Sequence, residues 1–278
     1  MESNKNSKLY IAIAFLGVVI LGLGGYIVYD KLYSPKNSNN KSQEANNQKE
    51  TMLVSKVYKD NDWVYDAEYE KKVTSDYYSL YNETFYAKDI VVPYINVESD
   101  YANNANNEIK KVLDDAVENY NEGASGEFSY IDECNYKYYL NNDGLSVILT
   151  YGVGSTDVVH PNYYIYNIDL KTGEELSYKD IYAIAGFNDN NIEAKAESAI
   201  TEIMHEKMKD FDYPEDYPEG TDFDTYNNES IKNYKESVEN NTIKYFLSSN
   251  KQLNVVVKLS IPAGQGFFDT IIPVKWYK

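Results

Sequence analysis

The chain has few of the side chains that usually catalyse reactions or bind transition metals. His160 and His205 are its only histidines, and Cys134 is its only cysteine. A histidine-based metal site or a Ser-His-Asp triad is therefore hard to assemble, and an intramolecular disulfide or a cysteine zinc site is impossible. We expect no catalytic residue, no metal site and no cofactor. A hydrolase that uses paired carboxylates stays open as an alternative, because acidic residues are plentiful.

Two segments combine polar side chains with the glycine and proline of ligand-binding loops. GVGSTDVVHPNYY, which starts at Gly152, predicts a loop between two strands, and turn formation is its plainer interpretation. DFDYPEDYPEGTDFDTYNNE, residues 210–229, concentrates carboxylates that could bind a hard cation such as Ca²⁺, but it lacks the spacing of an EF-hand. A contact for a basic protein and a solvated connection are the other interpretations of this segment. The candidate ligand-binding residues in the two segments are Gly152, Gly154, Asp157, His160, Tyr163, Asp210, Asp212, Asp216, Asp222 and Asp224.

The charge of the chain restricts its partners. The formal net charge is -18, and residues 51–278 contain 40 Asp and Glu against 20 Lys. A surface of this sign repels nucleic acid and anionic lipid, whereas it attracts a basic protein or a cation. Solubility alone is the competing explanation for the charge. The 30 tyrosines suit half-exposed sheet faces or contact surfaces, because each has an apolar ring with a polar tip.

The N-terminal region predicts a membrane anchor. Residues 9–29 form an uncharged run of 21 residues, and about 20 helical residues cross the hydrocarbon core. A cleaved signal peptide has a shorter apolar region of roughly 7 to 15 residues. We therefore expect a cytoplasmic tail over 1–8, an uncleaved transmembrane helix over 9–29, a flexible polar stalk over 30–52 and an extracytoplasmic domain over 53–278.

Periodicity in the remaining sequence predicts an α+β fold. Apolar residues recur every three or four positions in two segments, which predicts helices over roughly 101–121 and 189–209. Alternating apolar and polar residues predict strands, and Asn142-Asp143-Gly144 is typical of a hairpin turn between two of them. We expect an antiparallel sheet packed with two main helices. The predicted strands cover 128–140, 145–151, 163–170, 242–247, 253–259 and 268–276.

Several motifs carry a resemblance to a known family. NYYIYNIDLKTGEELSYKDIY at 162–182, IVVPYINV at 90–97 and the Gly152–Pro161 segment resemble extracytoplasmic domains of unknown function 4163 and 3298. These domains occur in the lysozyme-sensing anti-sigma factor RsiV and beside the catalytic domain of peptidoglycan deacetylases. The resemblance implies a first part over 85–182, a second part over 183–278 and a role in sensing or binding.

Two departures limit what the resemblance implies. Only eight residues precede the apolar run, so direct capture of a sigma factor is not expected. We also expect no metal-dependent hydrolase domain beside the predicted domain. We expect a non-enzymatic, membrane-anchored module that binds a cationic extracellular protein such as lysozyme. The alternative is a non-catalytic accessory module that binds cell-wall peptidoglycan.

Overall fold

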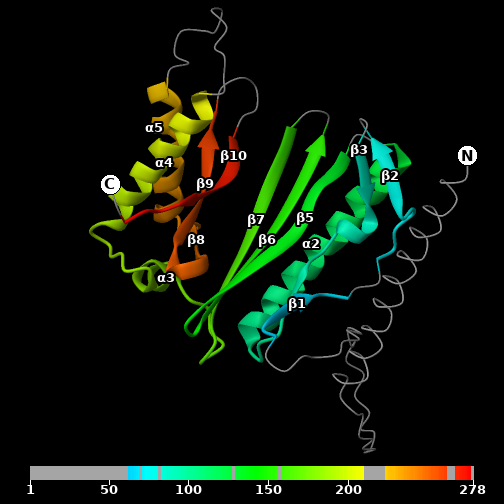
Figure 1. Ribbon diagram of the computed structural model, residues 1–278, viewed down its shortest axis with the longest axis horizontal. Coiled ribbons are helices and arrows are strands. Elements are labelled where there is room, and N and C mark those ends of the chain that lie inside the picture. Colours follow the sequence, from blue (N-terminus) through cyan, green and yellow to red (C-terminus); the bar gives the residue numbers. More distant parts are fainter. Residues whose placement is uncertain are drawn as a thin grey trace, which may run out of the picture. The chain divides into compact units, whose positions relative to one another are not determined.

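The computed structural model describes residues 62–68, 71–80, 83–126, 129–155, 158–209, 223–261 and 267–276. These residues confirm an α+β fold with antiparallel sheets (Figure 1). The chain divides into two units, Met1–Met52 and Leu53–Lys278, and only residues of the second are described. The predicted transmembrane helix and stalk therefore lie outside the described residues. No helix in the described part is long and apolar enough to cross a membrane.

The first half of the described unit is a three-stranded sheet covered by one long helix. Strands β5 (Ser129–Asn141), β6 (Gly144–Ser155) and β7 (Val158–Asp169) form an antiparallel meander in the order β5-β6-β7. Helix α2 (Asp100–Ser125) packs against this sheet (Figure 1), because its apolar residues fall on one face. The Ser99 hydroxyl caps this helix by accepting a hydrogen bond from the Ala102 amide.

Two short strand pairs and a 3-10 turn complete this half. Strand β1 (Val64–Asp66) pairs with β4 (Pro93–Ile95), and β2 (Tyr77–Leu80) pairs with β3 (Glu83–Tyr86). The turn η1 (Ala87–Asp89) follows β3. Aromatic packing joins the β2–β3 pair to α2. Tyr78 stacks on Phe85 at 5.2 Å between ring centroids and meets Tyr120 of α2 edge-on at 4.9 Å.

The second half has its own core, formed by three helices and another three-stranded sheet. Helices α3 (Tyr178–Ile184), α4 (Ile192–Lys209) and α5 (Phe223–Glu239) precede β8 (Lys244–Leu247), η2 (Ser249–Lys251), β9 (Leu253–Ser260) and β10 (Phe267–Pro273). The sheet order is β10-β9-β8. The largest side chains buried almost completely in this core are Tyr234, Ile181, Ile200, Met204, Leu247 and Leu253.

Buried polar side chains connect the two sheets. The Asn167 amide on β7 donates to the Tyr245 carbonyl of β8 at 2.8 Å, and its oxygen accepts from the Ser146 hydroxyl at 2.7 Å. The Leu247 amide donates to the same hydroxyl at 3.3 Å. These backbone groups of β8 would otherwise be buried without partners, so the bonds fix β8 against β6 and β7.

The predicted loop from Gly152 to Tyr163 is wrong, because most of this segment belongs to the β6–β7 ladder. Gly152 pairs with Pro161, and the ladder continues to Ser155 opposite Val158. The valines of this segment favour extended backbone. Pro161 lacks an amide hydrogen but is tolerated, because β7 is an edge strand of its sheet.

The prediction of two main helices on one sheet is also wrong. The structure has two three-stranded sheets, and α5 occupies 223–239, where we expected the end of an acidic segment and a connection. The sequence shows no clear apolar stripe for this helix, because two of its buried positions are the polar residues Asn227 and Ser230. Ser230 is satisfied internally, since its hydroxyl donates to the Tyr226 carbonyl at 2.8 Å.

Candidate functional site

A cavity of about 240 Å³ lies beside an irregularity in β5, and we call it the bulge cavity. Three carboxylates and three aromatic rings line it, and no lysine or histidine is among its lining residues. The aromatic rings belong to β3 and α2, whereas the carboxylates come from β3, η1 and β5. These six side chains are Glu83, Asp89, Asp132, Phe85, Tyr86 and Tyr120.

A β-bulge places Asp132 at this cavity. Ile131 pairs with Val153 and Glu133 pairs with Gly152, so Asp132 is the extra residue without a partner in the ladder. A bulge redirects side chains and often occurs near functional sites. Asp132 is exposed as a residue, but partial desolvation of its carboxyl raises the pKa of this group, and the neighbouring carboxylates of Glu133 and Glu83 raise it further. A cation in the cavity would relieve this repulsion.

Gly154 supports the aromatic wall of the bulge cavity from the neighbouring strand. It pairs with Tyr130, and a Cβ at Gly154 would lie 2.2 Å from the Tyr130 Cζ atom. Glycine therefore allows the tyrosine ring to lie close over the β6 backbone. Tyr130 in turn packs against Phe85 of the cavity at 5.4 Å between centroids. The predicted residues Gly152 and Gly154 thus act here as structural neighbours of the cavity.

Two lysines from outside the lining interact with the segment that carries Asp89. The Lys71 ammonium donates to the Ala87 carbonyl at 3.1 Å and also to the Ile90 carbonyl, and burial lowers its pKa. Lys88 lies 4.9 Å from the centroid of the Tyr86 ring. This second contact is a cation–π interaction, so one ring at the cavity already receives a cation within the chain.

A second cavity, of about 270 Å³, lies in the other half and is bounded by α3, α4, α5 and β8. We call it the tyrosine pocket after four of its lining residues, Tyr178, Tyr182, Tyr234 and Tyr245. The Tyr245 ring lies 6.5 Å from Tyr178 and 6.1 Å from Tyr182 between centroids. The hydroxyls of Tyr234 and Tyr245 are 2.9 Å apart. Burial raises both pKa values, that of Tyr234 to about 12, so both phenols are neutral at physiological pH.

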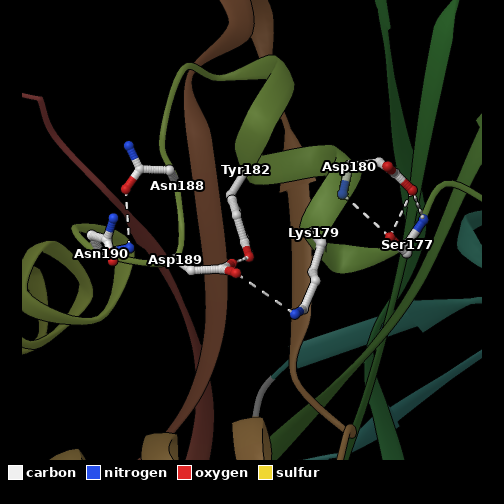
Figure 2. Close-up of polar contacts among 7 residues, drawn as sticks. All are labelled: Ser177, Lys179, Asp180, Tyr182, Asn188, Asp189 and Asn190. Carbon is white, nitrogen blue, oxygen red and sulfur yellow. Dashed lines mark hydrogen bonds and ion pairs between the residues drawn. The ribbon is translucent and has the colours of Figure 1, made fainter.

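Charged residues also line the tyrosine pocket, and Figure 2 shows the contacts of two of them, Lys179 and Asp189. The Tyr182 hydroxyl donates to Asp189, whose second oxygen lies 3.9 Å from the Lys179 ammonium. On α5, Lys235 forms ion pairs with Glu197 at 2.8 Å and Glu193 at 3.5 Å. The charged groups that line the pocket are thus largely paired with one another.

The backbone beside the pocket is held by local hydrogen bonds. Ser177 and Asp180 form a capping box at the start of α3, with their side chains 2.6 Å apart (Figure 2). In the following turn, the Asn188 side chain accepts a hydrogen bond from the Asn190 amide at 3.0 Å. These bonds satisfy free amides at helix starts and fix the position of Lys179 and Asp189.

The other candidate residues are not brought together in the described part. Tyr163 lies on β7, where burial raises its pKa and its carbonyl accepts a hydrogen bond from Lys244 at 2.7 Å. Asp224 is exposed in the first turn of α5. The backbone of His160 pairs with Val153 in β6, but its side chain lies outside the described atoms. The remaining candidates, Asp157, Asp210, Asp212, Asp216 and Asp222, lie outside the described residues.

A signal for the bulge cavity was present in the sequence but did not enter the prediction. The residues predicted on the apolar face of β5 have even numbers, yet position 132 is an aspartate and position 131 is an isoleucine. In the structure Ile131 is buried and Asp132 is exposed, so the alternation shifts by one at this point. Such a shift is the expected sequence mark of a bulge.

Neither a metal centre nor a relative gives further information about these cavities. Among the described residues, no group of three or more His, Cys, Asp or Glu could hold a metal ion. No protein-family model matches the chain, and no curated protein matches it. The chemistry of the two cavities and the sequence are therefore the features that indicate a function.

Proposed function

We propose that this chain is a membrane-anchored extracytoplasmic module that binds a basic extracellular protein. The observation that carries the proposal is the bulge cavity, in which carboxylates and aromatic rings converge without a basic lining residue. Lysozyme-like muramidases are the partner that the family resemblance implies.

The side chains of the bulge cavity suit the side chains of a basic partner. Lysine and arginine bind the faces of aromatic rings through cation–π interactions, and they form charge-assisted hydrogen bonds with carboxylates. Tyr86 is 41% exposed, so a second protein can reach the part of its ring that Lys88 does not cover. The raised pKa of Asp132 shows that its negative charge is disfavoured in the free protein. A cation of the partner would offset this cost, because a nearby positive charge favours the ionised carboxyl.

The distribution of charge also favours the first half of the domain, which contains the bulge cavity, as the binding face. Residues 62–176, which include the bulge cavity, contain 22 Asp and Glu against 7 Lys. Residues 177–276 contain 17 Asp and Glu against 10 Lys. The resulting field accelerates the approach of a basic protein and weakens as salt screens it.

A titration of the purified full chain with lysozyme tests the proposal. We expect saturable binding at low ionic strength that weakens at roughly 0.5 M salt, where the Debye length is only a few ångströms. Asp132→Asn combined with Glu83→Gln is expected to weaken binding by about tenfold or more, because charge-assisted bonds are lost. Glu236→Gln combined with Glu206→Gln is the matched control, because it removes the same charge from exposed positions of α5 and α4 outside the cavity. If both double variants lost the same affinity for lysozyme, net charge alone would explain the loss, and the bulge cavity would not be the binding site.

The alternative, an accessory module that binds peptidoglycan, predicts a different pattern. Binding to purified sacculi together with no binding of lysozyme would favour it. The proposed anchor has a separate test, which is protease treatment of intact cells. We expect the protease to remove residues 53–278 and to leave the apolar N-terminal segment in the membrane, whereas a protected domain would contradict the topology.

A further inference from the structure

We propose that the tyrosine pocket is a binding site for one uncharged sugar ring. This site lies in the second half of the domain, and its lining residues are all different from those of the bulge cavity. The inference goes beyond the capture of a basic protein and does not depend on it.

The walls of the pocket offer flat apolar surfaces. The rings of Tyr178, Tyr182 and Tyr245 lie within 6.1 to 6.5 Å of one another, and Ile192 and Val238 add aliphatic surface. The Tyr178 ring is only half-buried, so part of it remains open to a ligand. Aromatic faces of this kind pack well against the C–H groups on the face of a pyranose ring.

The interior of the pocket offers hydrogen bonds to hydroxyl or amide groups. The neighbouring Tyr234 and Tyr245 hydroxyls use one hydrogen in their mutual bond, and the second hydrogen remains available as a donor. Both phenols stay neutral, since burial raises both pKa values, that of Tyr234 to about 12. A ligand that is only apolar would offer no acceptor to this second hydrogen, whereas a hydroxyl or carbonyl oxygen would accept it.

The charges that line the pocket favour a ligand without net charge. Lys179 and Lys235 already lie near Asp189 and Glu193, and Glu239 adds one further carboxylate. The carboxylates would repel an anion, and the lysines would repel a cation. A neutral ring with hydroxyl substituents can instead accept from the ammonium groups and donate to the carboxylates.

The size of the pocket limits the ligand to about one ring. Its volume of about 270 Å³ is slightly below the usual range for drug-sized ligands, which begins at roughly 300 Å³. One ring of roughly 15 non-hydrogen atoms in an open pocket binds weakly, so we expect a dissociation constant on the order of 1 mM.

Saturation-transfer NMR on the purified full chain with N-acetylglucosamine tests the site. We expect saturable binding that Val238→Trp abolishes, because an indole on α5 would fill the pocket. Tyr178→Ala is expected to weaken binding by about tenfold, whereas Tyr178→Phe keeps the ring face and should change binding by less than about threefold. Tyr138→Ala is the matched control, because Tyr138 is 41% exposed on β5 and does not line the pocket.

The outcomes separate this proposal from its alternatives. No binding at about 50 mM sugar, or equal binding by Val238→Trp with a native thermal transition, would overturn the site. Preferential binding of free lysine or phenylalanine amide over the sugar would overturn its specificity for a neutral ring. Loss of lysozyme binding in the bulge-cavity variant leaves this experiment unaffected, so the two proposals can fail separately.

Discussion

Asn167 provides the sharpest test of how the two halves of the domain are joined. Its amide donates to the Tyr245 carbonyl, and its oxygen accepts from Ser146, which itself accepts from the Leu247 amide. Asn167→Ala removes two buried hydrogen bonds, each with a net value of about 1 kcal/mol, and leaves the carbonyl unpaired at a cost of about 1 to 2 kcal/mol. We therefore expect the free energy of unfolding to fall by about 3 to 4 kcal/mol.

Urea unfolding of the full chain, followed by far-UV circular dichroism and by tyrosine fluorescence, measures this loss. The midpoint is expected to fall while the m-value stays constant. Asn135→Ala is the matched control, because Asn135 is exposed and its side chain bonds only to Glu133 of the same strand among the described contacts. Its substitution should change stability by less than about 0.5 kcal/mol. A loss below 1 kcal/mol for Asn167→Ala would refute the reasoning that these bonds fasten the two sheets.

Three further predictions concern single positions. Gly173→Ala should lower the free energy of unfolding in urea by about 2 to 3 kcal/mol, because φ at Gly173 is +75° and the new Cβ would lie 2.6 Å from the Cβ of Ser99, the cap of α2. Gly126→Ala should cost only about 1 kcal/mol, because φ there is +89° but the space around it is open. Equal costs for the two substitutions would contradict the steric part of this prediction. Cys134 should react with a thiol reagent at pH 8 at least about 100-fold more slowly in the native protein than in urea, because the thiol is buried and burial raises its pKa to about 12. A fast reaction of the native protein would contradict the burial of this side chain. Asp132→Asn should raise the free energy of unfolding at pH 7, since a raised carboxyl pKa means that the folded state disfavours the charged form. This gain in stability should vanish below about pH 4, where the carboxyl is protonated in the unfolded chain too. A gain that persists below this pH would contradict the electrostatic cause.

The regular elements with clear periodicity were predictable from the sequence. Helix α2 begins within a residue of its predicted start, since its apolar residues recur at helical spacing. The turn at Asn142 and the strands on either side also agree with the prediction, because the alternation and the turn residues indicate the same hairpin. Cys134 lies in the core as expected, because it shares the apolar face of β5.

The features that escaped prediction depend on tertiary contacts. Helix α5 buries Asn227, Ser230 and Tyr234, and Ser230 is accommodated only because its hydroxyl finds partners in the folded chain. The contact between the two sheets involves Asn167, whose place in the alternation predicts the solvent face of a strand but whose side chain is buried against β8.

Both cavities join residues that are distant in the sequence. In the bulge cavity, Glu83 and Asp132 come from strands that are separated by the whole of α2. In the tyrosine pocket, Tyr178 and Tyr234 belong to different helices. Periodicity reports only neighbours along one element, so it could not identify either combination.

Hydrogen exchange of the full chain with and without lysozyme tests the central claim most directly. If the bulge cavity receives the basic partner, amides of Glu83–Tyr86 in β3 and of the β5 segment around Asp132 will become protected when lysozyme is added. High salt should remove this protection. Complex formation that protects only α3 and α5, or that leaves β3 and the bulge unchanged, would contradict the account.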